Sequence, residues 1–484
     1  MKTQFSFSSF FGKHEIVRKT LISISLFLCL SASSWAQTIP YTVANNSIFA
    51  DNEVYVCMVG KISGGHVWMD VKTGAVHSMN VSDNTVQGPI YGGNKGPGNN
   101  AMYCNYFSKL SDIPNKTINV PRIEGCRIFI SFKSQLYLYV FGATGGYAGV
   151  SLSNATDPNT GIRFEMIELT NASNGLWSNT TRVDSYQYPM GLEVWGNNGF
   201  YKKIGEMKTH DQIIAQWKAT APAEFQTCYD ATNNIIKFPT KNASFLDKGT
   251  YANYFQSYID AIWSKYTTAD LVFTAGDIGV WKGRISGDKF TFTNVANGLV
   301  GVIARKPTNL EVMEGSGTMA EGGENDKNMQ KFVCASINRH VIDLNAASGV
   351  NQIWSDDSKY YQTSPYNWYC KFFHSSDISY EAQTYTFCYD DVYDKSSTIN
   401  CPSAIKALIT IGGFAGANNP VTGVSISPTS ASINVGATQQ LTATVAPANA
   451  TNNAVTYTSS NTAIATVNAS GLVTGVTAGT APLQ

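Results

Sequence analysis

The sequence predicts a mainly β protein with a helical insertion and a second, smaller β-domain at its C-terminal end. Short runs of alternating apolar and polar residues recur between Gly, Asn and Pro turns, as in 127–141, 162–170 and 181–194. Charged residues make up 14% of the 484 residues, below the roughly 25% of typical soluble domains, while 43% are hydrophobic. After Gly412 the composition changes sharply to small and polar residues. This length and composition allow two or three domains with a large core.

The N-terminal segment has the pattern of an export signal. A basic flank, Lys13 to Lys19, precedes the apolar run 21–30 (LISISLFLCL), which is too short to span a bilayer. The small residues of 34–36 predict cleavage before Gln37. We therefore expect residues 1–36 to be a signal peptide and the mature protein to be secreted without membrane insertion. Retention of the signal as an anchor is the alternative.

The mature chain keeps an even number of cysteines. In an exported protein, this favours disulfides over free thiols, although buried free thiols remain the alternative. No C-x-x-C pair is present, and the sequence does not define a connectivity. The eight cysteines are Cys57, Cys104, Cys126, Cys228, Cys334, Cys370, Cys388 and Cys401.

Charge and motifs exclude several functions. The formal net charge is zero and there is no basic stripe, so we expect no nucleic-acid partner. The sequence contains no HExxH pair, Walker loop, strand-linked GxGxxG or GxSxG elbow. We expect neither a metal nor a cofactor, and we expect a monomer.

Two segments have helical periodicity inside the β-rich region. Apolar residues recur at i, i+3 and i+4 over 211–220 (DQIIAQWKAT) and 251–266 (YANYFQSYIDAIWSKY). These patterns predict two helices and account for the helical insertion.

A pair of alternating runs in 162–194 carries the candidate chemistry. If these runs form a hairpin centred near Leu176, Glu168 and Asp184 lie across from each other on one face. In that register Ile167, Leu169 and Val183 point to the other face, into the core.

Two facing carboxylates are what glycoside hydrolysis requires. One must donate a proton to the leaving oxygen, while the other must be ionised to activate water or to attack carbon. Trp177 would stack on a sugar ring, and Thr170, Thr181, Asn171 and Asn174 would bond sugar hydroxyls. The alternative is an ordinary surface hairpin that carries carboxylates.

The same region resembles glycoside hydrolase family 64, the β-1,3-glucanases related to thaumatin-like proteins. The resemblance spans roughly residues 120–405. Its motifs stand in family order: GCRIFISFKSQLYLYV, ATDPN, FEMIELT, TTRVDSYQYPMGLEV, KATAPAEFQTC, KGRISGDKFTFT, KPTNLEVMEGSGTM and TYTFCYDDVYDKSSTINCP. It implies a thaumatin-like β-sandwich or barrel core with a smaller α/β part, which together form a wide groove.

The resemblance also implies roles for individual residues. Glu168 matches the family's general acid and Asp184 its general base, while Thr170, Trp177 and Thr181 match groove positions. The asparagine contact is ambiguous between Asn171 and Asn174. The family inverts the anomeric centre, which implies carboxyl groups about 6.5–9.5 Å apart. Its members cut β-1,3-glucan endolytically to short oligosaccharides, commonly laminaripentaose.

Other acidic residues have structural interpretations. Glu165 lies on the opposite face of its run, so we expect it to be solvated or bonded to the backbone. Glu193 has no evident partner, and we expect Asp390 and Asp391 to be structural.

The C-terminal segment resembles the bacterial Ig-like domain, group 2. The motifs VTGVSISP, VGATQQLTATVAP and YTSSNTAIATVNASGLVTGVTAGTA stand in that family's order, and the segment ends where the family continues into a final strand. We therefore predict a catalytic domain at 37–411, a linker at 412–420 and an Ig-like sandwich at 421–484 that lacks its last strand, so that an edge is exposed.

Three functions are compatible with these observations. The first is a secreted, inverting endo-β-1,3-glucanase that acts on laminarin or curdlan. The second is a non-catalytic β-1,3-glucan-binding protein on the thaumatin-like scaffold, and the third is a surface adhesin. For the first, we expect the Ig-like tail to contact cell wall or polysaccharide.

Overall fold

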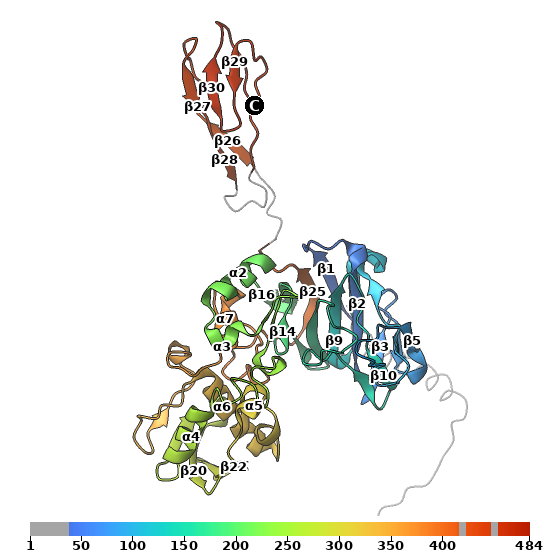
Figure 1. Cartoon of the computed structure of the whole chain (residues 1–484), viewed down its shortest axis with the longest axis vertical. Coiled ribbons are helices and arrows are strands. Elements are labelled where there is room, and N and C mark those ends of the chain that lie inside the picture. Colours follow the sequence, from blue (N-terminus) through green and yellow to red (C-terminus); the bar gives the residue numbers. More distant parts are fainter. Residues whose placement is uncertain (1–37, 416–422, 447–453) are drawn as a thin grey trace, which may run out of the picture. The chain divides into compact units, whose positions relative to one another are not determined.

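The structure is a computed structural model that describes residues 38–415, 423–446 and 454–484. The predicted signal peptide and most of the predicted linker lie outside these residues. The chain divides into two compact units, with the boundary between Gly412 and Gly413. The larger unit contains a β-sandwich lobe, formed by 38–183, 187–206 and 399–411, and an α/β lobe formed by 184–186 and 207–398 (Figure 1). The mainly β prediction with a helical part is thus confirmed.

The sandwich lobe consists of two sheets that enclose one apolar core, with members such as Tyr41, Ile128, Ile167 and Ile409. The first sheet has the order β16 (Tyr201–Gly205), β15 (Met190–Gly196), β25 (Ala404–Ile411), β1 (Ile39–Asn45) and β8 (Thr117–Val120). The second has the order β24 (Ile399–Cys401), β13 (Gly175–Thr180), β12 (Phe164–Ala172), β9 (Ile123–Phe132), β2 (Val54–Ile62), β3 (Gly65–Met69) and β4 (Val76–Ser78), with β7 (Ser108–Lys109) beside β2.

A smaller apolar cluster covers part of the outer face of the second sheet. Phe129 of β9 and Cys57 of β2 point into it, together with Leu136 and Tyr106 from the neighbouring loops. Two short ribbons belong to this layer: β5 (Asn84–Gln87) with β6 (Met102–Cys104), and β10 (Tyr139–Gly142) with β11 (Gly146–Ala148).

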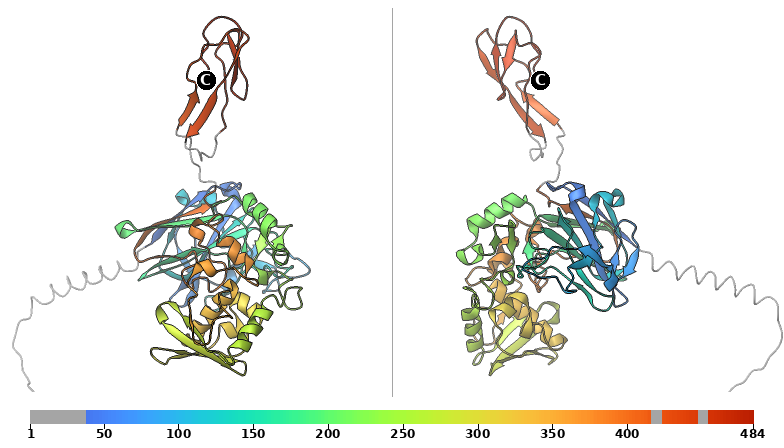
Figure 2. Two further views of the ribbon diagram at one scale, coloured as in Figure 1. Left: turned by 90° about the vertical axis from the view of Figure 1, so that its left-hand side faces the viewer. Right: turned by 45° about the vertical axis from the view of Figure 1, so that its right-hand side comes forward.

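The α/β lobe has its own core and two sheets. One sheet has the order β14 (Ser185–Tyr186), β18 (Ile235–Lys237) and β17 (Tyr229–Asp230); the other has the order β22 (Val300–Ile303), β21 (Lys289–Asn294), β20 (Val280–Ser286), β19 (Leu271–Thr274) and β23 (Asn351–Gln352). The helices are α2 (His210–Thr220), α3 (Ala223–Gln226), α4 (Gln256–Lys265), α5 (Asn309–Glu314), α6 (Glu324–Arg339) and α7 (Trp368–Phe373). Figure 2 shows the sheet of β19–β22 at the end of this lobe that is farthest from the sandwich.

The two predicted helices differ in how closely they match the structure. The pattern over 211–220 becomes α2, which begins at a capping box in which Thr209 and Gln212 bond each other's backbone N–H groups. The pattern over 251–266 becomes helical only from Gln256. Residues before it form turns, and the N–H of Phe255 donates to the side chain of Asn309 at 2.8 Å. Because of this contact with Asn309, α4 begins later in the sequence than the pattern predicts.

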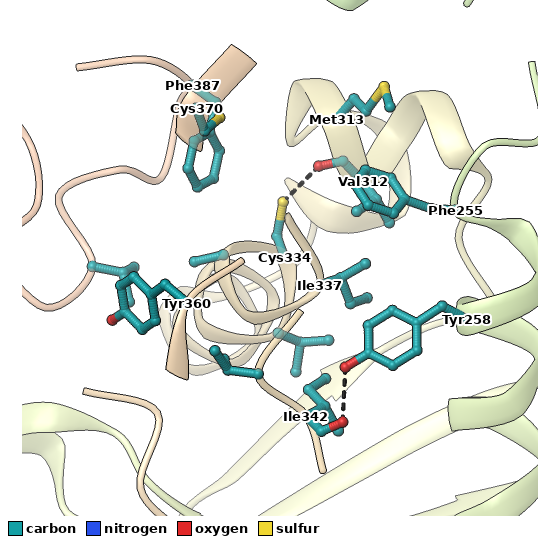
Figure 3. Close-up of a cluster of buried hydrophobic side chains, with 14 of the residues drawn as sticks. Phe255, Tyr258, Val312, Met313, Cys334, Ile337, Ile342, Tyr360, Cys370 and Phe387 are labelled. Atoms are coloured by element: carbon teal, nitrogen blue, oxygen red, sulfur yellow. Dashed lines mark hydrogen bonds between the residues drawn. The ribbon is translucent and has the colours of Figure 1, made fainter. Parts of the chain in front are cut away.

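Helix α6 lies at the centre of the α/β core (Figure 3). Its Cys334 thiol donates to the carbonyl of Val312 in α5 at 2.9 Å, and the Tyr258 hydroxyl of α4 donates to the carbonyl of Ile342 at 2.8 Å. These bonds satisfy polar groups that apolar packing would otherwise leave unpaired.

Among the described residues, the cysteines form none of the disulfides that the sequence favoured. All eight described cysteines have free thiols, and seven of them are buried. Burial raises the pKa of the Cys228 thiol to about 12, which keeps this sulfur protonated and chemically inert. The alternative of buried thiols therefore describes the structure.

The C-terminal unit consists of two small sheets with little core. The first is β26 (Gly423–Ser427) with β28 (Thr442–Ala446); the second has the order β27 (Thr438–Gln440), β30 (Leu472–Gly475) and β29 (Ala465–Val467). Leu441 and Val473 are the buried apolar residues among its described positions. Leu483 pairs with Ser459, so the last residues of the chain lie beside 458–460.

Candidate active site

Glu168 lies on a regular strand with one side facing the core. In β12, Ile167 and Leu169 are buried, while Glu168 and Thr170 are half-buried on the opposite face. This agrees with the predicted alternation. The side chain of Glu168 is 30% exposed, and its Oε1 lies 3.1 Å from Nε of Arg127 on β9.

The hairpin that follows Glu168 is tighter than predicted. Ser173 and Asn174 form a two-residue turn, so β13 pairs Asn179, not Asp184, with Glu168. The predicted register centred on Leu176 is therefore wrong. It assumed a long loop, whereas the Asn-Gly sequence at the turn permits a short one.

Asp184 lies where the chain leaves the sandwich for the α/β lobe. Strand β13 ends at Thr180 and β14 begins at Ser185, so Asp184 belongs to neither. Its side chain is 46% exposed, and Oδ1 lies 3.3 Å from Nζ of Lys241. Its carbonyl accepts a hydrogen bond from the N–H of Phe238 at 3.0 Å. Val183, predicted to enter the core, instead lines a cavity beside this segment.

The segment around Tyr385 contacts the residues just before Asp184. Thr181 forms a parallel bridge with Tyr385, whose carbonyl accepts the N–H of Arg182 at 2.7 Å. The hydroxyl of Tyr369 on α7 donates to the carbonyl of Arg182 at 2.8 Å. Burial raises the pKa of Tyr385, and the charges of Asp391 and Asp390 add to the shift.

Arg182 anchors this segment to the sandwich through a fully buried ion cluster. Its Nη2 lies 2.7 Å from Oε2 of Glu206, and its Nη1 bonds Oε2 of Glu165. Burial raises the pKa of Glu165 to about 7, although Arg182 and the N–H groups of Tyr188 and Gln187 oppose the shift. Burial outweighs these contacts because one guanidinium serves two buried carboxylates. Of the two expectations for Glu165, bonding to the backbone is found, whereas exposure to solvent is not.

The predicted sugar-binding residues fall into two groups. Trp177 is half-buried and lies directly opposite Thr170, on the face that carries Glu168. Thr181 is 6% exposed and Asn171 is 1% exposed. The amide of Asn171 donates to the carbonyl of Pro121 and accepts from Arg122, so it ties strand ends together. Asn174 is exposed in the turn.

Sequence reasoning missed three polar residues beside the carboxylates. Arg127 contacts Glu168 from β9, and Lys241 contacts Asp184 from the 3-10 turn η6 (Pro239–Lys241). Asn179 is the strand partner of Glu168, and its buried Oδ1 has no hydrogen-bond partner among the described residues. Strand alternation could have indicated Asn179 once the tight turn was recognised, but nothing local indicates Lys241.

A cavity of about 250 Å³ lies beside Asp184 in the α/β lobe. Its walls combine apolar side chains with a few polar groups, which is the composition of many ligand sites. The lining residues are Val183, Phe238, Thr240, Lys241, Met313, Glu314, Ser316, Phe387 and Cys388.

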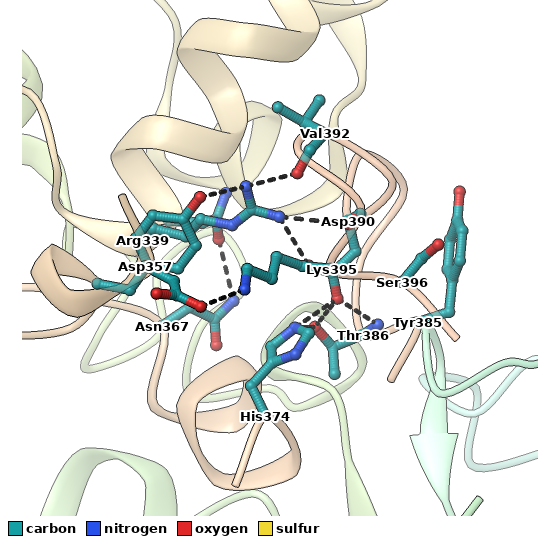
Figure 4. Close-up of polar contacts among 12 residues, drawn as sticks. Arg339, Asp357, Asn367, His374, Tyr385, Thr386, Asp390, Val392, Lys395 and Ser396 are labelled. Carbon is teal, nitrogen blue, oxygen red and sulfur yellow. Dashed lines mark hydrogen bonds and ion pairs between the residues drawn. The ribbon is translucent and has the colours of Figure 1, made fainter. Parts of the chain in front are cut away.

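Asp390 belongs to a buried structural network (Figure 4). Oδ1 lies 3.0 Å from Arg339, and Oδ2 lies 2.8 Å from Nε2 of His374 and accepts the hydroxyl of Thr386 at 2.5 Å. Burial opposes its charge, but His374 and Arg339 outweigh this effect and lower the pKa of Asp390 to about 2. This network fixes the segment that carries Tyr385.

Within the described ranges, no group of three or more His, Cys, Asp or Glu side chains could hold a metal ion. The same residues include no helix with the length and hydropathy needed to cross a membrane.

Partly exposed carboxylates from two lobes, with an indole nearby, are the groups that glycoside hydrolysis uses. The sequence family agrees with this class. Residues 37–411 match glycoside hydrolase family 64, described as β-1,3-glucanase, and residues 420–484 match the bacterial Ig-like domain, group 2. The chain belongs to glycoside hydrolase family 64 and carries a group 2 Ig-like domain.

Named relatives support the same family. A glucan endo-1,3-beta-glucosidase of Arthrobacter sp. (strain YCWD3) is 24% identical over 395 residues, which are 81% of this chain and 68% of that protein. A crystal structure of a β-1,3-glucanase domain from Clostridium beijerinckii is 34% identical with a TM-score of 0.69, and the match covers 78% of this chain and 98% of that one. The laminaripentaose-producing β-1,3-glucanase from Paenibacillus barengoltzii is 25% identical with a TM-score of 0.58, covering 79% and 77%.

Proposed function

We propose that this chain is a secreted, inverting endo-β-1,3-glucanase that releases short oligosaccharides such as laminaripentaose. In this proposal Glu168 is the general acid and Asp184 the general base, and no metal or cofactor takes part. Thr170 and Trp177 contact the sugar chain on the face that carries Glu168.

The observation that carries the proposal is the contrast in exposure among the carboxylates. The side chains of Glu168 and Asp184 are 30% and 46% exposed, whereas those of Glu165, Glu206 and Asp390 are at most 3% exposed. A carboxylate must reach the glycosidic oxygen or a water to act on it. Glu168 and Asp184 also come from different lobes, which suits a reaction in which acid and base flank the scissile bond.

One free oxygen on each carboxylate adds support. Arg127 holds Oε1 of Glu168 and Lys241 holds Oδ1 of Asp184. The second oxygens, Oε2 and Oδ2, have no hydrogen-bond partner among the residues that the structure describes. Each group therefore has one oxygen available for proton transfer.

The test is to incubate the secreted protein with laminarin, and to follow product size and the anomer formed first. The proposal expects short β-1,3-oligosaccharides that appear first as the α-anomer, because inversion converts a β-linkage. Glu168→Gln and Asp184→Asn should each remove this activity while the melting temperature stays unchanged. Glu193→Gln is the control, because this residue lies on β15 and bonds Tyr201.

Two results would contradict the proposed mechanism. Binding of laminarin without release of reducing ends would indicate the glucan-binding alternative. Full activity in both variants would remove Glu168 and Asp184 from the mechanism. Secretion is tested separately by finding the protein in the culture medium with Gln37 at its N-terminus.

A further inference from the structure

Lys241 lies between two carboxylates at the edge of the cavity beside Asp184. Its Nζ is 3.3 Å from Oδ1 of Asp184 and 3.6 Å from Oε1 of Glu314. The side chain of Lys241 is 27% exposed, so this ammonium lies partly shielded from solvent. Lys241 thus connects Asp184, which lies where the chain passes between the lobes, to the end of α5.

The backbone around Lys241 is fixed relative to Asp184. Lys241 ends the turn η6, which starts at Pro239, and the N–H of Phe238 just before it bonds the carbonyl of Asp184. The ion pair and this backbone bond join the same two segments. Movement of Lys241 away from Asp184 would therefore disturb both contacts.

Glu314 supports Lys241 from the opposite side. It is the last residue of α5, where the helix dipole disfavours a negative charge. The hydroxyl of Ser316 donates to its Oε2 at 3.3 Å. The ammonium of Lys241 offsets the unfavourable negative charge of Glu314. In return, Glu314 holds this ammonium close to Asp184.

Asp184 needs such support because its own segment is irregular. It belongs to no strand and has a short side chain that is nearly half exposed. A general base acts only when it is ionised and aimed at the attacking water. Lys241 contacts Oδ1, and no hydrogen bond from the described residues reaches Oδ2, which leaves Oδ2 as the oxygen that can accept a proton from water.

We propose that Lys241, held by Glu314, is a positioning residue that keeps the Asp184 carboxylate aimed at the attacking water. This inference rests on the proposed function, in which Asp184 is the general base. Apolar side chains of Phe238, Met313 and Phe387 line the cavity beside Lys241.

The test compares full-length variants on laminarin. We expect Lys241→Met to lower kcat by about 10- to 100-fold with KM within about twofold, because misplacing a reacting group affects the chemical step more than binding. Lys241→Arg should restore most of kcat, and Glu314→Gln should give a smaller loss. Lys241→Gln is measured as well, in case the methionine variant does not fold.

Lys237→Met is the matched control. Lys237 lies four positions earlier, its side chain is 24% exposed, and it pairs with Asp230 at 3.2 Å. It carries the same kind of surface ion pair with an aspartate that has no proposed role. Its kcat should stay within about twofold of the wild-type value.

A double-mutant cycle separates positioning from a structural role. In the Asp184→Asn background, Lys241→Met should cause no further loss of the residual kcat, since Lys241 acts through Asp184. An unchanged kcat in both Lys241→Met and Lys241→Gln would overturn the inference, as would additive losses in the cycle. If Glu168→Gln is inactive while the lysine variants are normal, this inference fails and the proposed function stands. A wild-type protein without hydrolysis would overturn both.

Discussion

The two proposed catalytic carboxylates stand on parts of the chain that are built differently. Glu168 lies within β12, between the paired strands β9 and β13. Asp184 lies between strands, and segments distant in sequence hold it there: Tyr385 through Thr181, then Phe238 and Lys241. The sheet places Glu168 by local periodicity, whereas the position of Asp184 depends on the joining of two lobes.

The largest expected effect separates the roles of the two carboxylates. On laminarin, Glu168→Gln and Asp184→Asn should each lower kcat by about 100- to 10,000-fold, the range of general acid–base catalysis. On a laminari-oligosaccharide with a dinitrophenyl leaving group, Glu168→Gln should recover because such a group departs without a proton. Asp184→Asn should stay inactive on both substrates. Recovery of Asp184→Asn instead would exchange the two roles.

The second largest effect should be the loss of stability when Arg182, which anchors the Asp184 segment, is replaced. Arg182→Met leaves Glu165 and Glu206 buried without a cation, which should lower the free energy of unfolding by about 3–5 kcal/mol. Arg127→Met removes the half-exposed partner of Glu168 and should cost less than about 1 kcal/mol. Urea unfolding of both variants measures the difference. Equal losses would mean that the two segments are equally well anchored.

The same anchor should make stability depend on pH. Burial raises the pKa of Glu165 from 4.5 to about 7, so the folded state binds this proton more tightly than the unfolded chain. Its contribution is therefore complete below the unfolded pKa and is lost as the pH rises through 7. Between pH 5 and 8, the wild-type protein should lose on the order of 2 kcal/mol of unfolding free energy relative to Glu165→Gln. Parallel stability curves would contradict this prediction.

A smaller effect is expected on substrate binding at the regular strand pair. Trp177 lies opposite Thr170 on the open face, so Trp177→Ala should raise KM for laminarin by about 2- to 10-fold, as expected for one lost aromatic contact. Trp195→Ala is the control, because Trp195 lies in the other sheet and stacks near Tyr201. Equal changes in KM would exclude a specific role for Trp177.

The smallest effect should come from removing the C-terminal unit. Because the chain divides at Gly412, ending it there should leave the melting temperature of the larger unit and its kcat on soluble laminarin unchanged. A lower rate on insoluble curdlan alone would support a role of the tail in contacting polysaccharide. The same loss on both substrates would show that the tail supports the catalytic unit instead.

Local patterns in the sequence were sufficient for the features that depend on near neighbours. The apolar spacing over 211–220 predicted α2, and the alternation around Glu168 placed Ile167 and Leu169 in the core and Glu168 on the open face. The family motifs agree with the family match over 37–411. These features follow from the periods of helix and strand, which any short window of sequence contains.

Only the tertiary structure decided the rest. Strand alternation specifies which face of the sheet a residue lies on, but not which residue of the next strand lies opposite it. The tight turn at Ser173 and Asn174 sets the register in which Asn179 lies opposite Glu168. Asn171 is buried at strand ends, and the cysteines pack as free thiols in three separate cores. Asp184 is placed by lobes that meet only after folding. By itself, the sequence determined which residues could react; long-range contacts decided which of them lie in the open and what holds them there.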